Sequence, residues 1–468
     1  ARSFDRDYDA AILLDKNSLH IHEEEFSEDC LVLYNFEGEY NDGIKIDTSE
    51  WEKVENMYFA GALFKILGIG KKGLLREVRK TWEESPLLDK DVMAIEEAYK
   101  RDYNKSFKDF EIGKGDKKGK YMNGTEATGI GSIESGLDVY FAYPMTPATP
   151  LLGFLAKKEE SYGYITYQPE NEIAVANAAL GSSFSGAKTM IGSSGGGVDL
   201  MGEALSMQGM TELPLVCYLA MRGGPSSGAA TYTSQQDLRM ALGIGHGDFP
   251  RVVIAPGDIE ESYKKAKEAF YLSEKYGLLN ILLTDKHLGE SGYTQEMENY
   301  DLFEKKDREV PGKEFVKRNS YTHDEKGNYT EDPEIIEKGA NKRKEKFERA
   351  KKEIENKFDT HKIYGRKNGK KLIIGFGSTK GPILDSLYNL KGYKYIHIIY
   401  MEPFSSKLKR EIEKAEEIFV VENNPSGQLA DLVEKNTQKS IDEEHRILKY
   451  NARPFTPNEI IERLDKND

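Results

Sequence analysis

Cysteine is scarce in this 468-residue chain, which contains only Cys30 and Cys217. Two thiols cannot hold a [4Fe-4S] cluster, a four-cysteine zinc site or a disulfide framework. Cys217 also falls inside an apolar run, where a thiol is an inert core residue rather than a nucleophile. Any cluster chemistry in which the chain takes part must therefore lie on another polypeptide.

Positive charge is also in short supply, because 66 Lys and Arg stand against 80 Asp and Glu, for a net charge of −14. A field of this sign repels phosphates, which excludes nonspecific attachment to nucleic acid or to an anionic membrane. No apolar run approaches the ~20 residues that span a bilayer, and the opening residues lack the order of a signal peptide. These absences predict a soluble, cytoplasmic protein with neither nucleic acid nor membrane as a partner. The sequence begins at Ala1 rather than Met, which leaves the natural start of the polypeptide open.

Strand-like apolar runs alternate with helix-like segments in three blocks of the chain, which predicts parallel βαβ units and an α/β fold. Charged connections separate the blocks, and Asp332-Pro333 predicts the start of a long, solvent-rich helix in the second connection. The last block includes one expected strand at 395–400. The expected divisions are 1–112, 113–295, a charged linker or arm at 296–369, and 370–468.

Ligands of parallel sheets bind beyond the carboxyl ends of strands, so the loops that follow strands are the candidate site. The first of these loops reads Tyr143-Pro144-Met145-Thr146-Pro147. Its two prolines fix φ on either side of Thr146 and hold the hydroxyl in a rigid turn, where it can bond a ligand oxygen. A stiff connection in which Thr146 only caps a helix is the alternative.

The second loop ends in Glu170-Asn171-Glu172, ahead of an alanine-rich helix. Acidic residues in a first helical turn are ordinary partners of the helix dipole. Glu172, however, lies on the face that small side chains make close-packed. A carboxylate there needs a hydrogen-bond partner, from the protein or from a cofactor.

The third loop reads Ser193-Ser194-Gly195-Gly196-Gly197. A glycine run between a strand and a helix lets backbone N–H groups approach an anion. The run matches neither common nucleotide signature. Close packing against a cofactor ring or a neighbouring subunit is an equally good explanation.

The fourth loop begins with Arg222-Gly223-Gly224, directly after an apolar strand. An arginine at a strand end, flanked by glycines, suits bidentate capture of a carboxylate. A salt bridge that ties two loops is the alternative. His246 lies in a later glycine-rich loop and is a further candidate for the same pocket, whereas no residues form a convincing metal site or nucleophile–base pair.

Taken together, these motifs resemble the α subunit of the 2-oxoacid:ferredoxin oxidoreductases, in the archaeal form with a γ domain fused ahead of the α part. The order of the motifs along the chain supports the resemblance. The segments that carry it are 123–127, 143–147, 170–172, 222–228 and 245–248, with 377–379, 403–404 and 422–429 in the last block.

The resemblance implies a thiamine-diphosphate pyrimidine-binding fold for the central block and a transketolase C-terminal-like fold for the last. The first block resembles the later part of the γ domain, without its usual glycine-rich opening. In the family's signature loop, Met145, Ala148 and Thr149 replace an isoleucine and two serines. The changed hydroxyl pattern leaves the preferred 2-oxoacid open.

The resemblance also implies shared thiamine-diphosphate chemistry, with Mg²⁺ and a [4Fe-4S] cluster on a β subunit, coenzyme A as cosubstrate and ferredoxin as electron acceptor. Glu172 matches the carboxylate that hydrogen-bonds the aminopyrimidine ring and relays a proton. Arg222 would pair with the substrate carboxylate, next to Thr146 and Gly223. The implied cofactor-binding residues are Tyr143, Pro144, Met145, Glu172, Ser193, Ser194 and Gly195.

The implied reaction is oxidative decarboxylation of pyruvate, 2-oxoglutarate or a branched 2-oxoacid to acyl-CoA and CO2. An indolepyruvate-type relative is a second possibility, and a noncatalytic assembly subunit is a third. Ferredoxins are usually acidic, so we expect ferredoxin to dock mainly on the β subunit.

Overall fold

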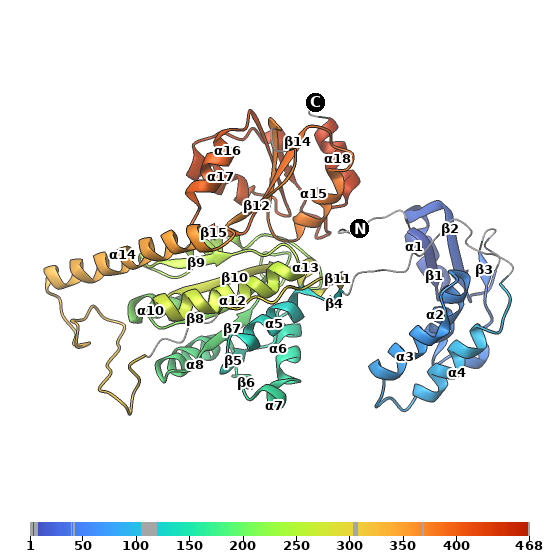
Figure 1. Ribbon diagram of the computed structural model, residues 1–468, viewed down its shortest axis with the longest axis horizontal. Helices are drawn as coiled ribbons and strands as arrows, with labels where there is room; N and C mark the ends of the chain where they lie inside the picture. Colours follow the sequence, from blue (N-terminus) through green and yellow to red (C-terminus); the bar gives the residue numbers. More distant parts are fainter. Residues whose placement is uncertain are drawn as a thin grey trace. The chain divides into compact units, whose positions relative to one another are not determined.

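The computed structural model describes residues 3, 8–38, 40, 43–103, 119–302, 308–366 and 369–466 (Figure 1). The chain divides into two compact units, one of Asp5–Lys118 and one of Gly119–Asp468 with Ala1–Phe4. The expected boundary between 112 and 113 lies outside the described residues. Among those residues, no helix combines the length and apolar character needed to cross a bilayer.

The smaller unit contains a parallel sheet in the order β1-β2-β3, with helices packed against it. Its core holds Leu33, Tyr58, Phe59 and Ile95, each fully buried. The α/β character predicted for this block is confirmed. The elements are β1 (Tyr8–Leu13), α1 (Lys16–His22), β2 (Phe26–Tyr34), β3 (Ile44–Lys45), α2 (Glu55–Ile66), α3 (Lys71–Thr81) and α4 (Leu88–Ala98).

The larger unit is built around a seven-stranded sheet in the order β15-β9-β10-β8-β7-β5-β6. Its strands are parallel except for β15, which pairs antiparallel with β9. The central strands β8 and β10 are buried along their whole length, as expected of a sheet covered on both faces. The bounds are β5 (Val139–Ala142), β6 (Ile165–Tyr167), β7 (Thr189–Ser193), β8 (Leu215–Met221), β9 (Arg251–Ile254), β10 (Leu279–Asp285) and β15 (Tyr400–Glu402).

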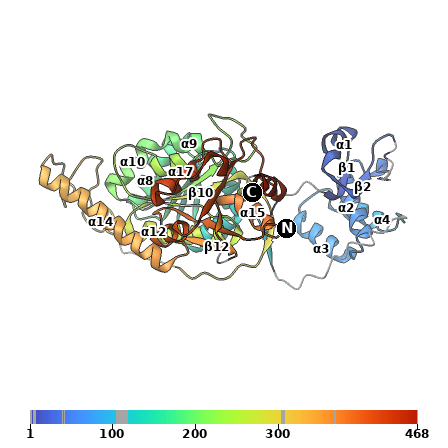
Figure 2. The ribbon, with the colours of Figure 1, turned by 90° about the horizontal axis from the view of Figure 1, so that it is seen from above.

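Two helical layers cover this sheet, with α8, α9 and α10 on one side and α12 on the other (Figure 2). Val175, Val198 and Leu205 pack on the first face, while Ala266 and Phe270 pack on the second. Side chains packed on both faces hold the strands in place, and with them the strand ends that carry the candidate site. The helices are α5 (Gly124–Glu134), α6 (Thr149–Ala156), α7 (Glu159–Tyr162), α8 (Glu172–Phe184), α9 (Gly195–Leu200), α10 (Gly202–Thr211), α11 (Leu238–Gly243), α12 (Ile259–Tyr276) and α13 (Lys286–Glu290).

A two-stranded antiparallel sheet pairs β4 (Lys120–Met122) with β11 (Tyr293–Gln295). A five-stranded sheet, called the third sheet below, has the order β12-β14-β13-β16-β17 and is parallel except for β12. The long helix α14 (Pro333–Lys357) precedes it, with the Asp332 side chain capping its first turn as the sequence predicts. The expected strand at 395–400 is in fact two strands, because the chain leaves the third sheet after Ile398 and joins the central sheet at Tyr400. The other elements are β12 (His361–Gly365), β13 (Lys371–Gly375), α15 (Lys380–Ser386), β14 (Tyr393–Ile398), α16 (Ser406–Glu413), β16 (Glu417–Glu422), α17 (Gln428–Thr437), β17 (Arg446–Leu448) and α18 (Pro457–Asp465).

Buried charges fasten the third sheet to α12. Glu261 accepts from Lys380 Nζ at 2.5 Å and lies 3.0 Å from His397 Nε2. Burial alone would raise the pKa of Glu261, but His397, Lys380 and Lys362 outweigh it and hold that pKa well below its usual range. The ionised carboxylate is therefore compensated, as a buried charge must be.

Candidate functional site

The carboxyl ends of β5, β7 and β8 lie side by side in the central sheet, because β7 pairs with both of its neighbours. The loops that follow them are the predicted segments 143–147, 193–197 and 222–228. Glu172 joins them at the start of α8, which packs on β5 and β7. The topology thus collects the predicted site segments at one edge of the sheet.

Glu172 is the first residue of α8, and the Asn171 side chain caps that helix by accepting from Ala174 N at 2.9 Å. The Glu172 side chain is 4% exposed, and its Oε1 has no hydrogen-bond partner among the residues that the structure describes. Such an oxygen is costly unless a donor satisfies it. The geometry therefore fits a ligand that brings a donor to this point.

Glycine at position 197 is what makes room for this carboxylate. A Cβ added there would lie 2.0 Å from Ser193 Oγ and 2.9 Å from Glu172 Oε1. Ser194 is also fully buried, and its hydroxyl is likewise without a partner within the described chain. The start of α9 therefore packs against Glu172 and leaves two buried polar atoms for a bound group.

Replacing Gly197 with Ala is expected to displace Ser193 and Glu172 and to lower the free energy of unfolding by about 1–3 kcal/mol. The physical reason is the overlap with Ser193 Oγ. Urea unfolding measures the change. Gly196→Ala is the matched control, because a Cβ at that position meets nothing within 4 Å. Equal losses in the two variants would contradict this description of the cradle.

Arg222 connects two of the predicted loops. Its Nη1 donates to the backbone carbonyl oxygen of Thr146 at 2.7 Å. The sequence left open whether this arginine ties loops together or captures a ligand, and it does tie loops, through a carbonyl rather than a carboxylate. A guanidinium carries five N–H donors in a planar fork, so one bond to Thr146 is compatible with capture of a carboxylate.

Asp237 belongs to this group of residues, although the sequence reasoning missed it. Its carboxylate packs on Gly195, where an added Cβ would lie 2.6 Å from Oδ2. Burial raises the pKa of Asp237 to about 6, Arg222 acts in the opposite direction, and Asp199 raises the pKa further. Asp237 directly precedes the helix that begins at Leu238, but its side chain makes no capping hydrogen bond in the described structure, and no motif in the sequence distinguishes it.

The remaining predicted residues differ in their surroundings. Met145 brings its sulfur to 3.8 Å from Ser193 Oγ, whereas Tyr143 is exposed. Gly223 pairs with Ala229 across its own loop. His246 is exposed, and its backbone N–H donates to Ser206 Oγ at 2.7 Å. No group of three or more metal-ligating side chains is present in the part of the chain that the structure describes.

A cavity of about 1050 Å³ lies elsewhere, between α14 and the segment 322–328. Its lining is mostly charged and includes Glu212, Glu334 and Lys342. None of the predicted site residues contributes to it. The size of this cavity therefore does not identify the candidate active site, because such a site needs a few polar groups that converge on the ligand.

Residues 130–364 match the family model described as pyruvate flavodoxin/ferredoxin oxidoreductase, thiamine diphosphate-binding. A 2-oxoacid:ferredoxin oxidoreductase subunit alpha from Saccharolobus solfataricus is 32% identical, over 90% of this chain and 73% of the relative. The 2-oxoglutarate synthase subunit KorA from Archaeoglobus fulgidus is 29% identical, over 67% of this chain and 90% of the relative.

A solved structure has the same fold. It is that of a 2-oxoglutarate:ferredoxin oxidoreductase from Magnetococcus marinus with 2-oxoglutarate, coenzyme A and succinyl-CoA bound. The TM-score is 0.87 at 24% identity, and the match covers 98% of this chain and 88% of the other. The predicted α/β architecture is thereby confirmed.

Proposed function

The chain belongs to the α-subunit family of the 2-oxoacid:ferredoxin oxidoreductases, and we propose that it supplies the aminopyrimidine half of a thiamine diphosphate site shared with a β subunit. The observation that carries this proposal is the Oε1 of Glu172, which is buried beside Gly197 and has no hydrogen-bond partner among the described residues. A cofactor nitrogen at that point would satisfy the oxygen, which can lie against the start of α9 because position 197 is a glycine.

Glu172 has the chemistry for a proton relay. A buried carboxylate that bonds a ring nitrogen can hold a proton at Oε1 and return it during the reaction. Thiamine diphosphate supplies the stabilisation of the carbanion that decarboxylation requires. The Ser194 hydroxyl, which is also buried and without a partner among the residues that the structure describes, would hydrogen-bond the same cofactor.

Arg222 and Thr146 would receive the 2-oxoacid. The guanidinium fork suits the planar carboxylate, and the bond from Nη1 to the Thr146 carbonyl fixes its direction. The Thr146 hydroxyl lies on the same turn and can bond the substrate next to that carboxylate. These two residues would thus orient the 2-oxo carbon for reaction without contributing covalent chemistry.

The β subunit would complete the site with Mg²⁺. It would also carry the [4Fe-4S] cluster, because the two cysteines of this chain are too few to hold one. Coenzyme A would take the acyl group, and two electrons would pass singly through the cluster to ferredoxin. The substrate class is pyruvate, 2-oxoglutarate or a branched 2-oxoacid.

Reconstitution tests the proposal. The chain is purified together with a β-type partner, supplied with thiamine diphosphate and coenzyme A, and offered each 2-oxoacid in turn. We expect CO2 release coupled to ferredoxin reduction, both dependent on coenzyme A. Preferred turnover of indolepyruvate would assign the chain to the arylpyruvate branch. A stable complex that turns over none of the 2-oxoacids would leave only an assembly role and would refute the proposal.

A further inference from the structure

The segment 233–239 connects the candidate site to the third sheet. Gln235 makes four bonds to residues directly after β13 and β16 of that sheet: its backbone N–H donates to Asn423 O at 2.8 Å, its Oε1 accepts from Asn423 N at 3.0 Å, its Nε2 donates to Phe376 O at 2.8 Å, and its backbone O accepts from Asn424 Nδ2 at 3.1 Å. Ser234 Oγ adds a fifth bond, to Asn423 O at 2.8 Å. Gln235 is completely buried, so these bonds are shielded from water.

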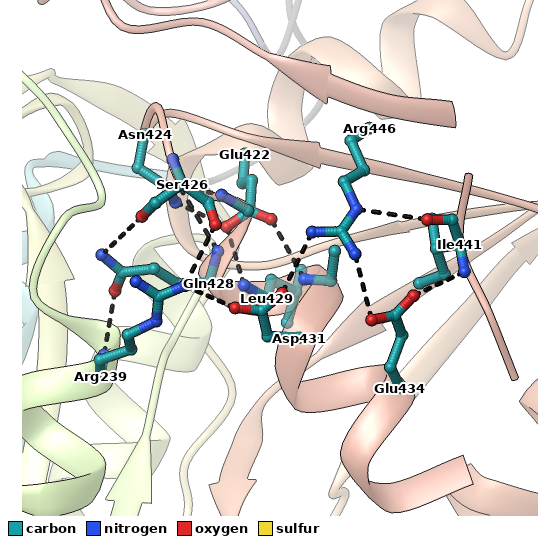
Figure 3. A network of polar contacts seen from close by, with 12 residues as sticks. Arg239, Glu422, Asn424, Ser426, Gln428, Leu429, Asp431, Glu434, Ile441 and Arg446 are labelled. Carbon is teal, nitrogen blue, oxygen red and sulfur yellow. Dashed lines mark hydrogen bonds and ion pairs between the residues drawn. The ribbon is translucent and has the colours of Figure 1, made fainter. Parts of the chain in front are cut away.

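Gln428, at the start of α17, hydrogen-bonds the backbone of the same segment at residues 236 and 239. Its Nε2 donates to Gln236 O at 2.7 Å. Its Oε1 accepts from Arg239 N at 2.9 Å (Figure 3). Both atoms of the amide are used on one short stretch of backbone. The third sheet therefore fixes the path of this stretch at two places, at Gln235 and around Gln428.

The start of α17 is itself rigidly anchored. Glu422 accepts from Leu429 N at 2.8 Å and from Ala430 N at 3.1 Å, and Asn424 Oδ1 accepts from Gly427 N at 2.8 Å (Figure 3). These bonds satisfy N–H groups that a helix start leaves without partners. The backbone around Gln428 is thus held in place by these hydrogen bonds.

The other side of the segment faces the site. The side chain of Gln236 accepts from Gly224 N at 3.1 Å, two residues beyond Arg222. The next residue, Asp237, packs its carboxylate on Gly195, and the charge of Arg222 acts on it. Consecutive residues of the segment therefore hold the loop that carries Arg222 and the glycine at the start of α9.

We propose that Gln428 is a positioning residue for Arg222. Gln428 lies at the start of α17 and does not touch the substrate, so its effect on Arg222 passes through the segment 233–239. The inference rests on the proposed function, in which Arg222 binds the 2-oxoacid carboxylate. Part of the substrate affinity is then set by the third sheet. If Gln428 no longer holds Gln236, the loop that follows Arg222 loses its fixed hydrogen bond.

Gln428→Ala in the reconstituted complex tests this. We expect the KM for the 2-oxoacid to rise roughly tenfold with kcat nearly unchanged, the size of effect that follows when a fixed hydrogen bond is released. Asn436→Ala is the matched control, because Asn436 lies on the same helix and bonds only locally, to Leu432 O at 2.8 Å. Gln236→Ala, which removes the acceptor for Gly224 N, should reproduce the KM increase if Gln428→Ala does not fold.

Amide hydrogen exchange gives a readout independent of activity. In Gln428→Ala, the peptide covering 222–228 should exchange faster than in Asn436→Ala, because Gly224 N–H loses its fixed acceptor. Unchanged KM and unchanged exchange relative to the control would overturn the inference. Faster exchange, with an Arg222→Ala variant that keeps its normal KM, would instead refute the substrate role of Arg222 and leave the structural coupling standing.

Discussion

Replacing Glu172 with Gln is expected to reduce the turnover of the assembled enzyme by roughly 10²–10⁴-fold, the range typical of a lost proton-transfer group. Glutamine preserves the shape of the side chain but cannot take up a proton at Oε1. The rate of ferredoxin reduction at saturating 2-oxoacid and coenzyme A measures the loss. Glu172 is 4% exposed, so a larger side chain would not fit. Glutamine adds no volume, and the fold should therefore be retained.

Glu170→Gln is the control for this experiment. Glu170 lies two residues earlier in the same loop and is exposed, so the same change of carboxylate to amide should leave turnover close to normal. A Glu172→Gln enzyme with full turnover would show that the buried carboxylate takes no part in the proton relay. Equal losses in both variants would point to the loop as a whole rather than to the one buried oxygen.

The Arg222→Ala variant should lose on the order of 10²-fold or more in kcat/KM for the 2-oxoacid, since a charge-assisted pair with the substrate carboxylate disappears. Arg222→Lys should recover only part of this loss, because an ammonium cannot donate as a fork to both the carboxylate and the Thr146 carbonyl. Steady-state kinetics across a range of 2-oxoacid concentrations separates the effect on KM from that on kcat.

Arg349→Ala serves as the control, because Arg349 is an exposed residue of α14 that none of the predicted site segments contains. The affinity for coenzyme A should stay normal in both arginine variants. If Arg222→Ala kept its kcat/KM, the bond to Thr146 would be the whole role of this arginine, and the loop-tying interpretation would replace the substrate-binding one.

The position of the candidate site was predictable from the sequence because it follows from topology. In a parallel sheet the carboxyl ends of strands share one edge, so the segments after β5, β7 and β8 had to converge. The environment of Glu172 was also foreseeable, since a carboxylate on a face of small side chains must be buried. That its Oε1 has no partner in the described chain depends on the packing of Gly197, which no local pattern reveals.

Asp237 and the segment around it escaped prediction for a physical reason. The bonds of Gln235 and Gln428 join residues nearly two hundred positions apart, and polar side chains in a loop carry no periodic signal. The division of 395–400 between β14 and β15 was missed for a similar reason. A continuous apolar run fits one buried strand as well as two strands that belong to different sheets.

The most direct test of the central claim is a structure of the assembled α–β complex with thiamine diphosphate bound. The proposal predicts that Glu172 Oε1 accepts a hydrogen bond from the aminopyrimidine ring, and that the Ser194 hydroxyl bonds the same cofactor. An aminopyrimidine ring bonded to a different carboxylate, with Glu172 Oε1 still buried and without a partner, would contradict it.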